Sequence, residues 1–377
     1  MRQPLGLGYG SPVSDSEEKI GPEANLHFSC VGEDLNNEEK VVEFFTDSRK
    51  VSRFLSKTDP NAVLGSVLGQ RFYDYRRRWD LAKTFRQIHP FPLHVDYELK
   101  SVCNLRCPMC LMSRRPQGDR PADPASPQLS INLVKKLIEE GVEAGQASMG
   151  FGGLWEPLLA PQLPDLVAFG RQKGLIEAMF NTNGLLLSKD VSKALIEAGL
   201  TRIMISLDAA TESTYRLVRP GSDFKEVKQN ILQLLALRKQ AHLKLPLVRL
   251  SFCLTSLNES ELSAFISQWE GKVDFFSLQY YGRYQPDSPG LFPAGGSVPP
   301  PSGRCAQPFK RLLVRHDGQV LPCCDLSALE LTMGNVHDKS LRQIWEGKSL
   351  KDLRESLLGD EKGYWPACRQ CQSKYER

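Results

Sequence analysis

The stretch "LHVDYELKSVCNLRCPMC", residues 93–110, joins an apolar run to three closely spaced cysteines. The run at 93–99 has the composition of a strand, so the cysteines follow in the loop after it. Cys103, Cys107 and Cys110 are spaced C-x3-C-x2-C, which lets one loop wrap a metal centre. A structural zinc site needs four ligands, and no fourth cysteine or histidine lies near in sequence. Three thiolates can instead hold a cubane iron–sulfur cluster and leave one iron open.

Strand and helix patterns alternate from residue 93 onward. We expect strands near 93–99, 147–152, 176–181, 201–207, 247–254 and 273–280, with helices between them near 131–144, 162–173, 188–198, 223–240 and 259–270. This alternation predicts an α/β fold of βα units around a parallel sheet. Six strands and five intervening helices fit a partial (β/α)6 TIM-like barrel better than the full eight-fold barrel. The site is then expected in the loops at the carboxyl ends of the strands.

Composition shifts divide the rest of the chain. Residues 1–90 are expected to begin as a poorly ordered polar segment and to continue as a helical segment, because apolar residues recur at helical spacing in "EEKVVEFFTDSRKVSRFL" (38–55) and "GQRFYDYRRRWDLAKTFRQI" (69–88). The barrel is expected over 91–285. The proline- and glycine-rich stretch 286–304 is expected to be a linker. A small unit at 305–377 holds five of the ten cysteines.

The overall composition narrows the class of partner and the compartment. The net charge of +4 is small for 377 residues and the basic residues are scattered, so we expect no nucleic-acid partner. No apolar run approaches the roughly 18 to 20 residues of a membrane span, and the first residues lack the apolar run of a signal peptide. We therefore expect a cytoplasmic protein that does not bind membranes. Cysteines in that compartment are metal ligands or catalytic thiols more often than disulfides.

With its C-x3-C-x2-C loop placed after a first strand, the chain resembles the radical SAM superfamily over residues 91–377. The resemblance implies that Cys103, Cys107 and Cys110 bind a [4Fe-4S] cluster whose open iron is chelated by S-adenosylmethionine (SAM). Reductive cleavage of SAM then gives a 5′-deoxyadenosyl radical, which abstracts a hydrogen atom from the substrate. An external one-electron reductant of the flavodoxin or ferredoxin kind is implied. Met109 stands where the family usually has an aromatic residue against adenine.

A second stretch, "GFGGLWEPLLAP" (150–161), is similar to the family's Gly-Gly-Glu motif, which binds the methionine amino group of SAM. Gly152, Gly153 and Glu156 are the matching residues. Leu154 and Trp155 intervene between Gly153 and Glu156, which leaves open an alternative in which Glu156 caps the next helix.

Two further stretches are similar to sequences common in the superfamily. "NTNGLLL" (181–187) contains Asn183, and "ISLDAATESTYRLVRPGSDF" (205–224) contains Ser206, Asp208 and Arg219. The resemblance implies that these residues bind SAM, with the last three directed at its carboxylate or ribose. Helix caps or surface ion pairs are the alternative roles.

The C-terminal unit can supply four thiolates to one site. Cys305, the Cys323/Cys324 pair, Cys368 and Cys371 are available, and a hairpin turn at Asp317-Gly318 brings the first two positions together. Four thiolates suit zinc or a fully ligated iron–sulfur cluster equally. The stretch resembles the auxiliary-cluster extension of SPASM and twitch enzymes, which implies one auxiliary [4Fe-4S] cluster held by Cys305, Cys323, Cys368 and Cys371. A fully ligated cluster has no open iron and is expected to carry electrons.

The remaining thiols suggest a reaction. Cys253, in the fifth strand, and Cys324 are candidate donors of a hydrogen atom to a substrate radical, while a buried structural cysteine is the alternative for Cys253. We expect the enzyme to modify a ribosomally made peptide by Cα epimerisation or oxidation, as enzymes with this extension often do. The first alternative is a radical SAM dehydrogenase of a sugar or aminocyclitol alcohol that passes an electron to the auxiliary cluster. The second is a metal-binding scaffold without catalytic activity.

Overall fold

The computed structural model describes residues 42–44, 52–56, 58–114, 128–281, 291, 304–360 and 363–371. The chain divides into two units, Met1–Glu38 and Glu39–Arg377, and all described residues lie in the second. The described strands form one sheet in the order β1-β2-β8-β7-β6-β5-β4-β3-β9-β10-β11. No helix in the described ranges has the length and hydropathy needed to cross a membrane.

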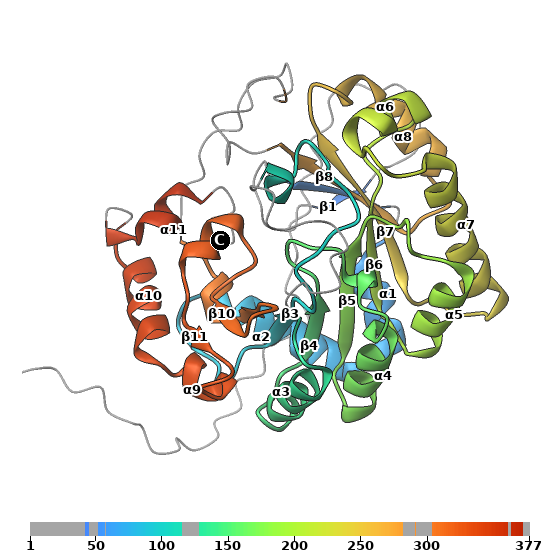
Figure 1. Cartoon of the computed structure of the whole chain (residues 1–377). Coiled ribbons are helices and arrows are strands. Elements are labelled where there is room, and N and C mark those ends of the chain that lie inside the picture. The colour runs from blue at the N-terminus through green and yellow to red at the C-terminus, as the bar shows by residue number, and fades with distance from the viewer. Residues whose placement is uncertain are drawn as a thin grey trace, which may run out of the picture. The chain divides into compact units, whose positions relative to one another are not determined.

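The middle of the sheet is the expected six-stranded parallel core (Figure 1). Its strands are β3 (His94–Tyr97), β4 (Ser148–Phe151), β5 (Glu177–Thr182), β6 (Arg202–Ser206), β7 (Leu247–Leu254) and β8 (Phe275–Tyr280). The helices between them are α3 (Ile131–Glu143), α4 (Leu163–Lys173), α5 (Lys189–Glu197), α6 (Glu212–Val218), α7 (Phe224–Gln240) and α8 (Leu262–Trp269). Short 3-10 helices are η1 (Leu111–Arg114), η2 (Pro157–Leu159) and η3 (Glu259–Glu261). The sequence therefore predicts the core strands to within about two residues.

The two faces of the parallel sheet differ in polarity. On β7, Val248, Leu250 and Phe252 are fully buried in the main hydrophobic core. Alternate side chains of a strand point to opposite faces, so Arg249 and Cys253 share the other face. That face is polar on neighbouring strands too: Arg249 Nη2 donates to Asn181 Oδ1 at 3.3 Å. The sequence pattern alone left the direction of Cys253 undecided, and the structure places it on the polar face.

The N-terminal segment is only partly helical. Helices α1 (Pro60–Leu68) and α2 (Gln70–Ala82) are present as expected. The helix expected within 38–55 is wrong, because the described residues there form strands β1 (Val42–Phe44) and β2 (Ser52–Ser56). β2 pairs antiparallel with β8 and β1 with β2. The edge of β8 offers unpaired backbone groups, and a segment rich in valine and phenylalanine satisfies them better as a strand than as a helix.

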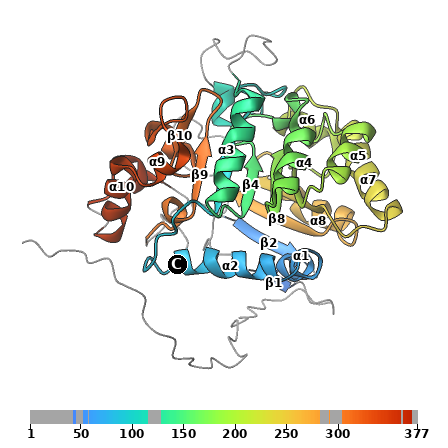
Figure 2. The ribbon, with the colours of Figure 1, turned by 90° about the horizontal axis from the view of Figure 1, so that it is seen from below.

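Helices α1 and α2 lie on the side of the sheet opposite α3 and α4 (Figure 2). Tyr75 Oη accepts a hydrogen bond from Ser148 Oγ at 3.1 Å, at the start of β4. Arg71 donates to the Gly174 carbonyl at 2.8 Å and Arg78 to the Gly145 carbonyl at 3.4 Å, so these arginines cap the carboxyl ends of α4 and α3. The contacts cover the amino ends of the strands and leave the carboxyl ends for the site.

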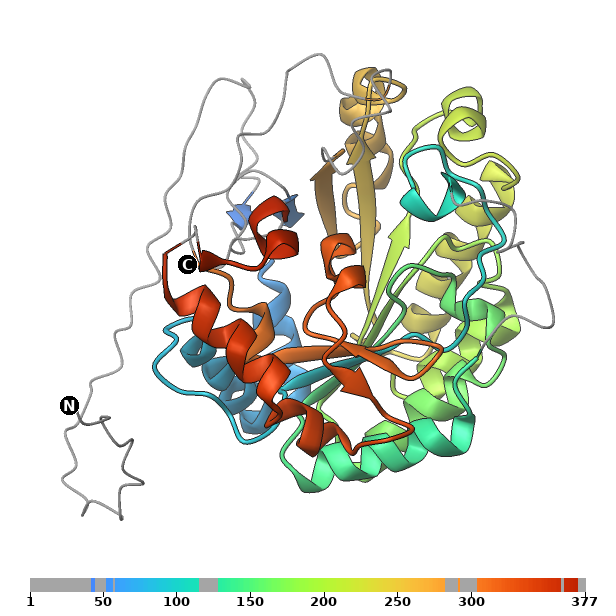
Figure 3. The ribbon, with the colours of Figure 1, turned by 60° about the vertical axis from the view of Figure 1, so that its left-hand side comes forward.

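The C-terminal unit continues the sheet beyond β3 (Figure 3). β9 (Arg311–Val314) pairs parallel with β3, and β10 (Gln319–Leu321) pairs antiparallel with both β9 and β11 (Gly334–Asn335). The hairpin turn expected at Asp317-Gly318 is present, with Gly318 at a φ of +82°. The remaining elements are η5 (Gln307–Phe309), η6 (Leu326–Glu330), α9 (Leu341–Trp345), α10 (Lys348–Leu358) and α11 (Pro366–Gln370). The expected linker at 286–304 lies outside the described residues except for positions 291 and 304.

Candidate functional site

The three loop cysteines follow β3 at the carboxyl end of the parallel strands. Cys107 is buried, while Cys103 and Cys110 are half-buried. Cys103 Sγ accepts the Leu105 backbone N–H at 3.5 Å, and Cys107 Sγ accepts from Arg219 Nη1 at 3.7 Å. Burial raises the pKa of the Cys103 thiol to about 11. Three thiols in one loop, two of them already receiving hydrogen bonds, form a donor set that fits an iron–sulfur cluster.

Glu156 joins the loop after β4 to the carboxyl end of β5. Its Oε1 accepts from Thr182 Oγ1 at 2.7 Å and from the Leu158 N–H at 3.1 Å, and its Oε2 accepts from the Asn183 N–H at 2.8 Å. Burial raises the pKa of this carboxyl group, which is only 4% exposed. Glu156 caps η2, as the alternative interpretation has it. Its contact with the methionine amino group stays a prediction.

The other positions expected to bind SAM lie in the cysteine loop itself or at the carboxyl ends of β4, β5 and β6. Asn183 Nδ2 donates to Asn104 Oδ1 at 2.7 Å, beside the first cysteine of the motif. Gly152 has a φ of +120°, a conformation that residues with a side chain rarely adopt. Ser206 is the half-buried last residue of β6, and Met109 packs against the main hydrophobic core. Their contacts with SAM remain predictions.

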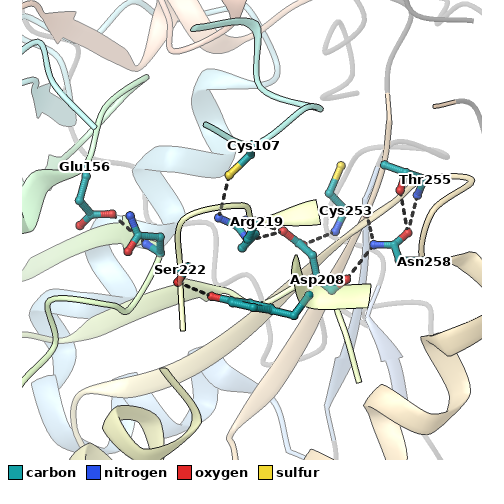
Figure 4. Close-up of polar contacts among 10 residues, drawn as sticks. Cys107, Glu156, Asp208, Arg219, Ser222, Cys253, Thr255 and Asn258 are labelled. Carbon is teal, nitrogen blue, oxygen red and sulfur yellow. Dashed lines mark hydrogen bonds and ion pairs between the residues drawn. The ribbon is translucent and has the colours of Figure 1, made fainter. Parts of the chain in front are cut away.

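Asp208 and Arg219 form a buried ion pair beneath the cysteine loop. Asp208 Oδ2 accepts from Arg219 Nε at 2.8 Å and also from Nη2, with side chains 1% and 12% exposed. Burial alone would lower the pKa of Arg219, but Asp208 and then Cys107 hold it above its ordinary value. Figure 4 shows Arg219 between Cys107 and Asp208. A fixed cation therefore lies against the cluster loop, and neither residue is a surface ion pair.

Cys253 is fixed to the same pair through its backbone. Its N–H donates to Asp208 Oδ1 at 2.7 Å, and its carbonyl accepts from Asn258 Nδ2 at 2.9 Å. Asn258 also donates to the Asp208 carbonyl at 2.8 Å and accepts from the Thr255 N–H at 2.8 Å. In Figure 4 the Cys253 and Cys107 sulfur atoms lie on the same side of the Asp208–Arg219 pair. Burial, and after it Asp208, raises the pKa of the Cys253 thiol, so the thiol keeps its hydrogen near neutral pH.

Asn258 is a site residue that sequence reasoning missed. It is fully buried in a loop and joins the turns after β6 and β7. A weak signal was present, because an asparagine three residues after a threonine, as in Thr255 to Asn258, often bonds to the local backbone.

The C-terminal cysteines lie around α11 and the β9–β10 hairpin. Cys305, Cys323 and Cys368 are half-buried against the main hydrophobic core, and Cys371 is buried. Burial raises the pKa of Cys305 to about 11, and Cys368 next to it acts in the same direction. Cys323 likewise has a raised pKa because of burial and then of Cys305. Cys324 is exposed, unlike its neighbour.

Within the described ranges, no three histidine, cysteine, aspartate or glutamate side chains are close enough to hold a single metal ion. Both predicted ligand sets therefore remain proposals: Cys103, Cys107 and Cys110 in the loop after β3, and Cys305, Cys323, Cys368 and Cys371 in the C-terminal unit.

Sequence profiles of known families match both regions that contain the cysteine groups. A sequence profile of the radical SAM superfamily matches residues 97–256, and the profile of the SPASM iron–sulfur cluster-binding domain matches residues 305–372. The chain carries a radical SAM domain. This domain implies a [4Fe-4S] cluster and SAM as cofactors, and the SPASM domain implies auxiliary iron–sulfur binding.

Relatives and solved structures support the family and the fold. The GTP 3′,8-cyclase of Chlorobaculum tepidum is 30% identical over 199 residues, which are 51% of this chain and 56% of the relative. The chain thus matches about half the length of this curated relative. Streptococcus suis SuiB bound to S-adenosylmethionine superposes with a TM-score of 0.55 at 16% identity, over 75% of this chain and 72% of SuiB. Native anSMEcpe with bound AdoMet has a TM-score of 0.54 at 17% identity, over 74% of this chain and 88% of that one.

Proposed function

We propose that this radical SAM enzyme inverts a Cα centre in a peptide, with Cys253 as the hydrogen-atom donor. When bound, the cluster and SAM supply a 5′-deoxyadenosyl radical that abstracts a hydrogen atom from the substrate. The observation that carries the proposal is the place of Cys253. Its thiol is on the polar face beside the Asp208–Arg219 pair, and its pKa is raised, so it holds the hydrogen that a substrate radical needs.

The chemistry at Cys253 is a hydrogen-atom transfer. The S–H bond breaks, a C–H bond forms at the substrate carbon, and the donor is left as a thiyl radical. One electron from the external reductant and one proton from solvent restore the thiol. The substrate gains one hydrogen atom for the one it lost, so its own oxidation state is unchanged. Asp208 and Asn258 hold the backbone of Cys253 on both sides, which fixes the point from which hydrogen is delivered.

A peptide substrate is supported by the proteins of similar fold. One structure of anSMEcpe, with a TM-score of 0.53 to this chain, contains a bound Cp18Cys peptide. The match with the GTP 3′,8-cyclase of Chlorobaculum tepidum spans only about half of both chains, so its nucleotide substrate is not carried over. One auxiliary cluster held by Cys305, Cys323, Cys368 and Cys371, a flavodoxin- or ferredoxin-like reductant and a cytoplasmic location complete the proposal.

Turnover in D2O tests the proposal. Candidate peptides are incubated anaerobically with reconstituted enzyme, SAM and dithionite, and the products are analysed by mass spectrometry. We expect a gain of one mass unit at a single carbon with wild-type enzyme. The Cys253→Ala variant should release 5′-deoxyadenosine without this gain, and Cys324→Ala serves as the matched thiol control.

The other outcomes identify the competing functions. Loss of two mass units, with no deuterium incorporated, would establish a dehydrogenase in place of an epimerase. Normal deuterium incorporation by Cys253→Ala together with loss of it in Cys324→Ala would move the donor role to Cys324.

A further inference from the structure

Glu98 is a buried carboxylate that none of the roles above uses. It follows β3 directly and precedes Cys103 by five residues. Its side chain is only 1% exposed. The neighbouring positions, which point to the opposite face of the sheet, are apolar. A buried carboxylate persists only where donors or cations compensate its charge. Its partners therefore indicate what it connects.

One oxygen of Glu98 holds the loop after β4. Oε1 accepts the Leu154 backbone N–H at 3.1 Å. Leu154 and Trp155 are the two residues that separate Gly153 from Glu156. A Cβ added at Gly153 would lie 3.0 Å from the same Oε1, so the carboxylate and this loop are in close contact. Glu98 thus anchors the segment that departs from the family's Gly-Gly-Glu spacing.

The other oxygen of Glu98 holds the hairpin between β9 and β10. Oε2 is 2.8 Å from His316 Nδ1 and 3.5 Å from Arg315 Nε. The Glu98 backbone N–H also donates to the Val314 carbonyl at 2.8 Å. This hairpin leads through β10 to Cys323, and Cys305 precedes β9. A single carboxylate therefore joins the loop expected to bind SAM to the hairpin that Cys305 and Cys323, two candidate auxiliary-cluster ligands, flank in sequence.

We propose that Glu98 is a positioning residue that holds the SAM-binding loop and the auxiliary-cluster hairpin in register with each other. Because the same charged carboxylate contacts the loop and the hairpin, its loss should affect the SAM site and the auxiliary-cluster site at once. The inference rests on the two cofactor sites and not on the role proposed for Cys253.

The test uses the Glu98→Gln variant of the reconstituted full-length chain. Glutamine keeps the shape and one acceptor oxygen but removes the charge. We expect SAM to bind about ten-fold more weakly, measured by titrating the SAM-induced change in the EPR signal of the first cluster. The reduction potential of the auxiliary cluster should rise, because removal of a buried negative charge favours the reduced state.

Glu177→Gln is the matched control. Glu177 is another fully buried carboxylate, paired with Arg202 Nε at 2.7 Å, but it lies at the amino end of β5. We expect this variant to lose stability with unchanged SAM affinity and auxiliary-cluster potential. If SAM affinity and the auxiliary-cluster potential change equally in Glu177→Gln and Glu98→Gln, the effect is a general structural one and the proposal is overturned.

His316→Ala supplies an independent arm that keeps Glu98 in place. His316 contacts the carboxylate from the hairpin side. If the two sites are joined through Glu98, removing this contact weakens SAM binding a few-fold, although the substitution lies in the auxiliary domain. Unchanged SAM affinity in His316→Ala, or in Glu98→Gln, would refute the link.

Discussion

Replacing Asp208 with asparagine separates charge from backbone geometry at the centre of the site. Asp208 has a φ of +58°, and asparagine, like aspartate, is among the non-glycine residues that most often adopt this left-handed conformation. The amide oxygen can still accept the Cys253 N–H that now bonds to Oδ1 at 2.7 Å. What is lost is the negative charge facing Arg219, whose side chain is 12% exposed. Arg219 is then a nearly buried cation without its carboxylate.

The size of the effect follows from this burial. Removing one partner of a buried ion pair costs about 3–5 kcal/mol, because the remaining charge stays desolvated. We therefore expect Asp208→Asn to lower the free energy of unfolding by about that amount. The double variant, Asp208→Asn with Arg219→Met, removes both charges. Its loss of unfolding free energy should be smaller, by about 1–3 kcal/mol, than the sum of the losses in the two single variants.

Denaturant unfolding of the four reconstituted proteins, followed by circular dichroism, measures this cycle. The same samples should show weaker SAM binding in Asp208→Asn, because Arg219 is no longer held in place. A destabilisation below about 1 kcal/mol, or additive single effects, would refute the argument that Asp208 and Arg219 act as one buried unit.

Four further outcomes are expected. Glu156→Gln leaves at least one of three donors without a good acceptor, so the free energy of unfolding should fall by about 1–3 kcal/mol in a thermal or denaturant assay. A change under about 0.5 kcal/mol would contradict the tie between the loop after β4 and the end of β5. Because the pKa of Cys253 is raised, its thiol should resist alkylation by iodoacetamide from about pH 6 to pH 9. An ordinary thiol begins to ionise near pH 8, so rapid labelling of Cys253 at that pH would count against a protonated hydrogen donor. If Cys323 is the auxiliary-cluster ligand, iron analysis of Cys324→Ser should give about eight irons per chain, the content of two clusters, and that of Cys323→Ser should fall towards about four. The reverse result would assign the ligand role to Cys324. Arg71→Ala removes a helix cap at the opposite end of the strands, so a loss of about 0.5–1 kcal/mol of stability is expected with unchanged SAM affinity, and weaker SAM binding would show that the amino end also shapes the site.

The parallel core is predictable because its strands and helices differ in period and are separated by clear turn residues. The N-terminal strands are not predictable in the same way. "VVEFFTDSRKVSRFL" contains apolar residues that fit either period, and the exposed edge of β8 decides the outcome through backbone pairing. This edge exists only once the distant strand has formed, so no local pattern contains it.

The site residues also differ in whether local sequence predicts them. The spacing of Cys103, Cys107 and Cys110 is local, and it predicts a cluster loop from sequence alone. The contacts of Asp208 with Arg219 and with Cys253 depend on residues 11 and 45 positions away. Their partners are set by the order of strands in the sheet, which is why each could also be interpreted as a cap or a surface pair. Glu98 gave only one signal, an acid at the end of an apolar strand.

Formation of 5′-deoxyadenosine by the reconstituted protein tests most directly the central claim, that three thiolates leave one iron open for SAM. The protein is reconstituted anaerobically, incubated with SAM and dithionite, and the products are quantified by liquid chromatography and mass spectrometry. The wild-type protein should release 5′-deoxyadenosine and methionine in equal amounts, and Cys107→Ala should release neither. Absence of 5′-deoxyadenosine from wild-type protein with a full iron content, with or without candidate substrate, would contradict the account.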